Sequence, residues 1–268
     1  MLIRNPCAAG SFYPSSREEL FQFCRTYLET SSKQVHAKAV ILPHAGYVYS
    51  GQTACRVLSR VAVPEKNILI GPNHKRSGSD FALFCRGEWQ TPLGKAPVAG
   101  DLAMSLLEAS HDLRNDEQAH GSEHSLEVLI PFLQFKNPAA QIAPLIVGTL
   151  DLGLAREAAL AIGTMLAVRK ERFLAVISND MSHYESDEAT RRKDRYALDA
   201  IENLDEEALV KAVKKYRVTM CGFVPVYMLL VMKEALGIKS ATLVDYTTSA
   251  DATGDTERVV GYAGFIFE

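Results

Sequence analysis

The sequence predicts an α/β fold, a single domain whose mostly parallel or mixed central sheet is covered by helices on both faces. From residue 38 onward, short Val/Ile/Leu-rich runs alternate with longer helical patterns. That alternation is typical of strands buried between two layers of helices. No Ser/Gly/Pro-rich linker longer than a few residues and no repeat of fixed period divides the chain. We therefore expect one domain over residues 1–268.

Six apolar runs are the expected strands, because each is short and rich in branched side chains. They cover residues 37–43, 66–72, 141–148, 172–180, 240–246 and 258–267. The segment 81–94, with the only Trp, predicts a further strand and a turn. Helical spacing of apolar residues predicts helices over 17–29, 52–60, 99–109, 124–134, 153–169, 187–202, 206–216 and 221–236.

The composition excludes several classes of function. With 29 Lys+Arg against 32 Asp+Glu the net charge is -3, so the chain lacks the cationic surface that nucleic acid requires. Five Cys without a CxxC pair do not indicate a disulfide framework or a zinc ribbon. No apolar stretch is long enough to span a bilayer, and no phosphate-binding glycine loop or GxSxG elbow occurs. We expect a cytoplasmic protein that binds neither nucleic acid nor membrane.

Polar side chains follow four of the expected strands directly. His44, His74 and the pair Asp180 and His183 each come after an apolar run, and Asp251 lies in the loop after residue 246. In an open α/β sheet the crevice beyond the carboxyl ends of the strands is where ligands bind. If the strands are parallel, these side chains meet at one edge of the sheet.

Such a set predicts a metal or catalytic site. Two imidazoles and one carboxylate form the ligand set that non-heme Fe(II) prefers, and imidazole-rich sets also suit Zn or Cu. Further histidines and acids nearby can orient the ligands or transfer protons. A structural interpretation stays open for each residue: a loop histidine bonded to backbone, Asp180 as a helix cap, and Asp251 as a turn residue.

A second histidine cluster lies at residues 120–133. Residues 120–124 match the HxxEH pattern of inverted zincins, but Gly121 and Ser122 indicate a helix start, which places His120 before the helix. We expect instead that His124 and Glu127 open a helix whose first turn points at the same crevice. Glu127 could equally be a favourable charge near a helix N-terminus.

Cys221 stands at the expected start of the helix 221–236. A thiolate there would be stabilised by backbone N–H groups, which would make the residue reactive. The alternative is a small buried residue at a helix start, and we favour it because free Cys is commonly buried and no histidine is close in sequence.

Taken in order, a set of short motifs resembles the Memo family, named for mediator of ErbB2-driven cell motility, whose prokaryotic members are called AmmeMemoRadiSam system protein B. The motifs are SFYP (11–14), PHAGYVYSG (43–51), GPNH (71–74), EHSLE (123–127), LIVGTL (145–150), SNDMSH (178–183), CG (221–222) and VGYAGF (260–265). They span almost the whole chain, and PHAGYxYSG together with GPNH is the most specific part.

The resemblance implies a single α/β domain similar to class III extradiol dioxygenases, in which iron sits between two histidines and a carboxylate. It assigns the metal histidines to His44 and His74. It implies that the rest of the pocket includes His124, Asp180 and His183. The third ligand falls on Asp251, the acidic residue of the pattern YxxSxDxxGD that prokaryotic relatives show.

The function implied is that of a non-heme iron-dependent redox enzyme, with Fe(II) favoured and Zn or Cu as alternatives. In that enzyme His124 or His183 would move protons and Asp180 would orient a histidine. The second hypothesis is a non-catalytic module that binds a small-molecule or peptide ligand in the same pocket. Prokaryotic members commonly accompany a radical SAM protein, which suggests such a protein as a partner. A zinc-dependent hydrolase is the third hypothesis.

Overall fold

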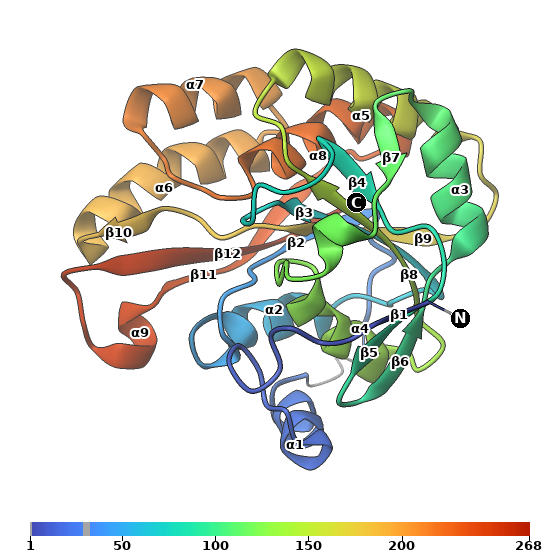
Figure 1. Ribbon diagram of the computed structural model, residues 1–268. Coiled ribbons are helices and arrows are strands. Elements are labelled where there is room, and N and C mark those ends of the chain that lie inside the picture. The colour runs from blue at the N-terminus through green and yellow to red at the C-terminus, as the bar shows by residue number, and fades with distance from the viewer. Residues whose placement is uncertain (1, 29–32) are drawn as a thin grey trace.

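The parallel centre of the main sheet fixes the positions of the polar loops. In the computed structural model, which describes residues 2–28 and 33–268, a nine-stranded sheet runs in the order β10-β12-β2-β9-β3-β8-β4-β7, with β11 paired to β12 (Figure 1). The strands β2 (Ala39–Leu42), β9 (Phe173–Ser178), β3 (Lys66–Pro72) and β8 (Gln141–Val147) are mutually parallel. Their carboxyl ends therefore lie at the same edge.

Antiparallel strands flank this centre on both sides. On one side β12 (Val259–Phe267) pairs with β2, and β11 (Ala241–Thr248) and β10 (His183–Glu185) pair with β12. On the other side β4 (Phe81–Leu83) runs antiparallel to β8, and β7 (Leu113–Asn115) runs parallel to β4. A small second sheet joins β1 (Ile3–Arg4), β5 (Glu88–Thr91) and β6 (Gly94–Pro97). The sheet is mixed, which confirms the predicted fold class.

Central strands bury both faces, because successive side chains point to opposite sides of a sheet. Ile41 pairs in register with Ile177 and belongs to one core cluster, whereas Val40 pairs with Val176 and belongs to the other. Full burial of a side chain of this size contributes about 1.5–3 kcal/mol. The continuous apolar runs of the sequence have this two-sided burial as their cause.

Helices cover the two faces as predicted. One face carries α3 (Gly100–Ala109), α5 (Leu152–Ala167), α6 (Asp187–Glu202), α7 (Glu206–Tyr216) and α8 (Phe223–Leu236). The other carries α1 (Arg17–Tyr27), α2 (Gln52–Leu58) and α4 (Ile130–Lys136). Helices α1, α5, α6 and α7 begin at side-chain caps that accept backbone N–H groups, given by Ser16, Asp151, Ser186 and Asp205.

Among the predicted helices, the one expected over 124–134 differs most from the structure, and several others differ at their ends. The segment expected as a helix from 124 starts with a loop residue and a turn, followed by a short 3₁₀ helix (Glu127–Leu129) and then α4. His124 therefore lies in a loop and does not open a helix, which corrects the prediction. The helix expected over 17–29 ends at Tyr27, and its last predicted residue lies outside the described residues. Across residues 2–28 and 33–268, we find no helix with the length and apolar character needed to cross a membrane.

Candidate metal centre

The carboxyl ends of the parallel strands gather five of the predicted site residues in one cavity. His44, His74 and Asp180 each follow a central strand by two residues. A cavity of about 560 Å³ at this edge has all three in its lining, together with His124 and His183. Segments far apart in the chain thus deliver four imidazoles and a carboxylate to a common space.

Cys221 is the third potential ligand beside the first two histidines. Its Sγ lies 3.3 Å from Nε2 of His44. One ligand atom each from His44, His74 and Cys221 lie within 4.8 Å of one another. The expectation that Cys221 is only a small structural residue is therefore not met, since its side chain lines the cavity.

Asp251 lies outside this cavity, although the sequence predicts it beside the histidines. It belongs to the short helix α9 (Ala250–Thr253), at the outer end of the β11 and β12 hairpin (Figure 1). Its carboxylate accepts hydrogen bonds from Arg191 at 3.2 Å and from the backbone N–H of Thr248 at 2.8 Å, and its side chain is 51% exposed. The cavity lining does not include it. The structure thus brings Cys221, and not Asp251, to His44 and His74.

The hydrogen bonds around His44 fix its tautomer. The hydroxyl of Ser178 donates its single hydrogen to the carbonyl of Ser125 at 2.6 Å. The same oxygen lies 2.7 Å from Nδ1 of His44, so it must accept a hydrogen from that nitrogen. Nδ1 therefore carries the proton, and Nε2 presents its lone pair towards Cys221.

Glu123 fixes the His74 ring in a similar way. Its carboxylate accepts the backbone N–H of His74 at 2.6 Å, Nδ1 of His74 at 2.9 Å and the backbone N–H of Ser125 at 2.8 Å. Burial alone would raise the pKa of Glu123, but these hydrogen bonds and the neighbouring imidazole lower it to about 2. The ionised carboxylate holds the proton on Nδ1 of His74, so Nε2 is the nitrogen that carries the free lone pair. A carboxylate behind a ligating histidine is a common arrangement in metal sites.

The protonation states suit a site for a cation. Burial, and then repulsion from His74, hold the pKa of His44 well below its usual value, so this imidazole is neutral. Burial, and then the Asp180 carboxylate, raise the pKa of the Cys221 thiol. A bound metal ion reverses that shift, because a coordinating thiol loses its proton. Metal binding at this set therefore releases a proton from Cys221.

The remaining predicted residues surround this trio. Asp180 accepts the backbone N–H of His44 at 2.8 Å, and burial raises its pKa. His124 packs against the Phe12 ring with centroids 4.3 Å apart, and burial, followed by repulsion from His44, lowers its pKa to about 4. His183 donates from Nδ1 to the carbonyl of Thr219 at 3.0 Å, so its Nε2 is the nitrogen with the lone pair. These side chains are placed to orient ligands or exchange protons.

Two other candidates from the sequence have structural roles. Glu127 is fully buried and accepts hydrogen bonds from Arg4 at 2.5 Å, from Tyr13 at 2.7 Å and from two backbone N–H groups. It does not point at the cavity, which corrects the prediction for its helical turn. His120 donates from Nε2 to the carbonyl of Ala82 at 3.0 Å, so the HxxEH pattern does not form a zinc site.

A second cluster of potential ligands is formed by His74, Glu123 and His124, whose ligand atoms also lie within 4.8 Å of one another. Both Glu123 oxygens already accept N–H groups, and the residue is fully buried. An ion there would displace the hydrogen bonds that orient His74. The trio with Cys221 is therefore the better metal site.

Comparisons with known proteins agree with this architecture. A family model described as Memo-like protein matches residues 4–266. The chain is 39% identical to a "MEMO1 family protein" of Aquifex aeolicus, over 100% of both chains, and 34% identical to one of Methanobrevibacter smithii, again over 100% of both. Its structure is similar to that of the uncharacterized protein JW3007 from Escherichia coli K12, with a TM-score of 0.53 and 14% identity over 85% of this chain and 98% of that one. The structural likeness shows the fold alone.

Proposed function

The chain belongs to the Memo-like protein family, and from that premise and the pocket geometry we propose that it is a metal-dependent oxidoreductase. In this proposal one transition-metal ion is held by Nε2 of His44, Nε2 of His74 and Sγ of Cys221. The single observation that carries the proposal is that His44, His74 and Cys221 each offer one ligand atom within 4.8 Å of the others. The fold similarity to class III extradiol dioxygenases that the family implies supports redox chemistry without establishing it.

The donor set narrows the choice of metal. Imidazole suits Zn, Cu and Fe, whereas a thiolate favours softer ions than a carboxylate does. Because the third ligand is Cys221 and not Asp251, the analogy with iron sites made of two histidines and one carboxylate is weaker. Fe(II) remains the metal of the proposal, with Cu and Zn as the alternatives that elemental analysis separates. When bound, a redox-active ion with open coordination positions supplies a site for oxygen or a chelating substrate.

The chain's own residues divide the remaining work. Glu123 and Ser178 hold the two imidazole rings in the tautomers that a metal requires. His124 and His183 line the cavity, where they are placed to accept a proton from a bound substrate or to donate one to it. Asp180 fixes the backbone of His44, and Phe12 shields one side of His124 from water.

The direct test combines metal analysis with oxygen uptake. Two preparations are compared: protein purified without added metal, and protein reconstituted anaerobically with Fe(II). We expect both to hold metal at micromolar concentration and to consume oxygen with catechol-like compounds. His44→Ala and His74→Ala should abolish both. Failure of the parent protein to bind Fe(II), Cu or Zn at micromolar concentration would end the proposal. Zinc in the purified protein, with no oxygen uptake, would favour hydrolysis instead.

One observation favours a second candidate, a module that binds a small-molecule or peptide ligand without turnover. The cavity has aromatic side chains at its rim, of which Tyr49 is 44% and Tyr184 66% exposed. Exposed aromatic side chains are common in recognition surfaces. A radical SAM protein is the partner we propose for this case. A module should keep its partner when His44 and His74 are both replaced by Ala, whereas an enzyme should lose its metal and its activity.

A further inference from the structure

Within residues 2–28 and 33–268, four residues other than glycine have a positive φ angle, namely Arg76, Tyr184, Leu204 and Arg217. This left-handed region is costly for a residue with a Cβ atom, and bulky side chains rarely adopt it. Leu204 and Arg217 lie at the ends of α6 and α7, where a left-handed residue commonly terminates a helix. Arg76 follows the turn at residues 74–75. Neither a helix end nor a turn accounts for Tyr184.

Tyr184 lies inside a strand. It is the middle residue of β10, and its φ angle is 63°. Its two neighbours in the strand pair with adjacent residues of β12, 260 and 259, so Tyr184 is one extra residue between the two pairs. This arrangement is a β-bulge, and a left-handed residue in a bulge is usually glycine. A tyrosine therefore occupies a backbone position that glycine would adopt without strain.

The residues on either side hold the bulge in place. The backbone N–H of His183 donates to the hydroxyl of Thr219 at 2.8 Å, and Lys193 donates to the carboxylate of Glu185 at 2.5 Å. The Tyr184 side chain, in contrast, is 66% exposed, and its hydroxyl forms no hydrogen bond with any residue that the structure describes. Neither burial nor hydrogen bonding thus gives a structural reason for a tyrosine here.

The Tyr184 ring belongs to the metal cavity, because it is part of the lining of that cavity of about 560 Å³. It meets the imidazole of His183 in a T-shaped contact, with ring centroids 5.7 Å apart. The guanidinium of Arg258 lies over the ring, 5.7 Å from its centroid. The cation covers one face of the ring, so a ligand that enters has the other face available. Bulges next to active sites commonly re-aim a side chain in this way.

Other aromatic side chains line the same cavity, namely Phe12, Tyr49 and Tyr262. Tyr49 is 44% exposed and forms part of the rim with Tyr184. Aromatic rings in offset or edge-to-face contact attract one another beyond the effect of buried area. Cavities of roughly 300–1,000 Å³ commonly hold small organic molecules. An aromatic ligand can therefore gain more from this lining than an aliphatic ligand can.

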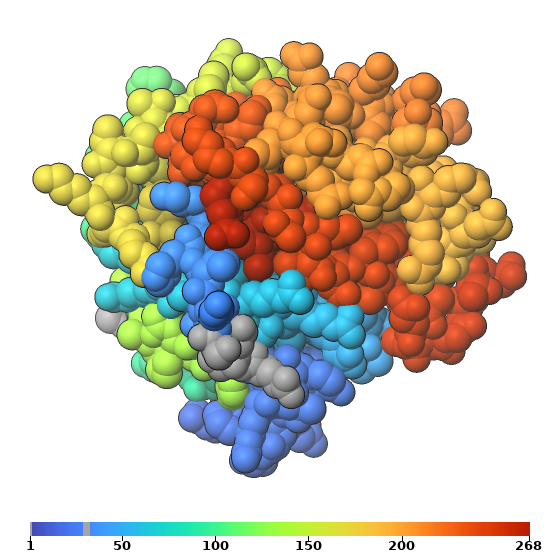
Figure 2. Space-filling view, turned by 180° about the vertical axis from the view of Figure 1, so that it is seen from behind, coloured from blue at the N-terminus to red at the C-terminus, as the bar shows by residue number. Residues whose placement is uncertain are grey.

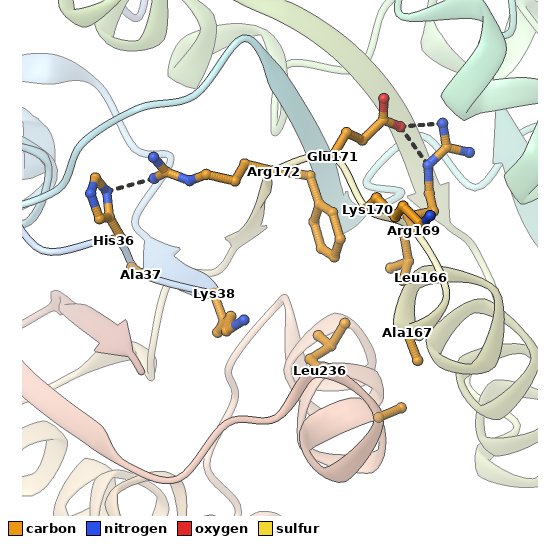
Figure 3. A pocket seen from close by; sticks show the side chains of 12 residues that line it. His36, Ala37, Lys38, Leu166, Ala167, Arg169, Lys170, Glu171, Arg172 and Leu236 are labelled. Carbon is orange, nitrogen blue, oxygen red and sulfur yellow. Dashed lines mark hydrogen bonds and ion pairs between the residues drawn. The ribbon is translucent and has the colours of Figure 1, made fainter.

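A cavity of about 590 Å³ at the amino ends of the parallel strands offers no comparable position. Figure 2 shows the face on which the chain around residues 36–38 meets the segment 169–173. In this cavity the guanidinium of Arg172 turns to His36 on one side, whereas Arg169 pairs with Glu171 on the other (Figure 3). These charged groups are directed at protein partners and not at a common ligand, so we assign no ligand to it.

We propose that Tyr184 determines the specificity of the metal cavity, by stacking on an aromatic ring of a ligand whose donor atoms face the three metal ligands. The strained backbone at Tyr184 carries the proposal, because the protein retains a tyrosine where glycine would remove the strain. The ligand class is an aromatic compound with a chelating group. The position of its chelating group rests on the proposed function, whereas the preference for a ring is a separate claim.

The test compares two hydroxamates that share a chelating group, benzohydroxamate with an aromatic ring and acetohydroxamate with a methyl group. The full-length chain is loaded with Co(II), and the visible spectrum of the ion follows binding. We expect the parent to bind benzohydroxamate at least about tenfold more tightly than acetohydroxamate. Tyr184→Gly should reduce this preference to about twofold. Tyr184→Phe should retain it, because the ring and not the hydroxyl makes the contact; loss of the preference in Tyr184→Phe would overturn the stacking role.

Stability separates this role from a structural one. Tyr184→Gly removes the strain, so it should unfold at an equal or higher urea concentration than the parent and keep its affinity for Co(II). Arg217→Gly is the matched control, because it relieves a similar φ angle at an exposed helix end. It should also retain stability, and it should bind both hydroxamates as the parent does. A lower urea midpoint for Tyr184→Gly would show that the tyrosine supports the fold and would overturn the proposal.

The metal-free chain separates this proposal from the proposed function. Failure of the parent to bind Co(II) would end the proposed function, but calorimetry can still compare the two hydroxamates on the metal-free protein. A preference for benzohydroxamate that Tyr184→Gly loses, in either form of the protein, supports the ring contact. Equal affinity of the parent for the two compounds in both forms would overturn it, as would an equal preference in the parent and Tyr184→Gly.

Discussion

Sγ of Cys221 lies 3.3 Å from Nε2 of His44, although 177 positions separate the two residues in the chain. The loop after β9 brings them together. The backbone N–H of Cys221 donates to the carbonyl of Asp180 at 3.1 Å, and the N–H of Gly222 donates to the side chain of Asn179 at 2.9 Å. Helix α8 therefore starts against the end of the central sheet, beside the loop that carries His44.

Gly222 permits this close approach. A Cβ atom at this position would lie 2.4 Å from the carbonyl oxygen of Ser178 and 2.7 Å from Cβ of Asn179. We expect Gly222→Ala to lower the free energy of unfolding by about 1–3 kcal/mol, since overpacked positions cost this much. The displaced helix start should also move Cys221 and weaken metal binding. Urea denaturation and a metal titration measure the two effects.

Gly100→Ala is the matched control for that variant. The nearest atom to its added Cβ is 3.6 Å away, which is an ordinary contact, and the residue begins α3. Its stability should stay equal to that of the parent or rise slightly, because Ala favours a helix over Gly. Equal stability of Gly222→Ala and Gly100→Ala would show that the approach of α8 to the sheet is not tight.

Ser178 is expected to act on the metal through His44. Ser178→Ala removes the acceptor for Nδ1 of His44 and leaves the ring free to adopt the other tautomer. Loss of such an orienting group typically lowers metal affinity about 10–100-fold. Competition with a chelator measures the affinity, and ¹⁵N NMR of the imidazole reports the tautomer. Ser59→Ala, which removes a hydroxyl that donates to the carbonyl of Arg56, should leave both unchanged. An unaltered His44 tautomer in Ser178→Ala would refute the assigned role.

His120 makes folding sensitive to acid. Burial lowers the pKa of this fully buried imidazole from an ordinary value of 6.5 to about 3. Between these values the unfolded chain binds a proton that the folded chain does not, so stability falls as pH drops through 6.5 towards 3. From pH 7 to pH 5 this residue alone should cost about 2 kcal/mol of unfolding free energy.

His120→Gln should therefore lose less stability between pH 7 and pH 5 than the parent does, by about 2 kcal/mol. Urea denaturation at the two pH values measures the difference. His111→Gln replaces an exposed histidine and should retain the full pH dependence of the parent. If His120→Gln and the parent lose the same stability over this range, the buried imidazole is not the cause of the acid sensitivity.

Much of the fold is visible in the sequence. Runs such as residues 66–72 are apolar without alternation because both faces of the central strands are buried, and this pattern predicted a sheet covered by helices on both faces. The predicted helix start was wrong for the segment around His124. Local spacing resembles a helix there, but buried hydrogen bonds to Glu123 and Glu127 hold a loop and a turn in its place.

The site was predictable to the extent that strand ends determine it. His44, His74 and Asp180 each follow a parallel strand, so topology alone brings them to one edge. The position of Cys221 depends on how the start of α8 packs against the loop after β9. Hydrogen bonds between residues far apart in the chain hold it there, and no local sequence pattern predicts them. Asp251 follows a strand too, but the antiparallel hairpin of β11 and β12 takes it to the outside.

Titration with Co(II) tests the central claim, that His44, His74 and Cys221 hold one ion together. We expect the parent to bind one equivalent of Co(II) and to show the near-ultraviolet absorption of a thiolate bound to cobalt. Cys221→Ser should lose that absorption and most of the affinity, whereas the exposed Cys7→Ser should behave as the parent. Retention of the absorption and affinity in Cys221→Ser, with loss of affinity in Asp251→Asn, would contradict the account.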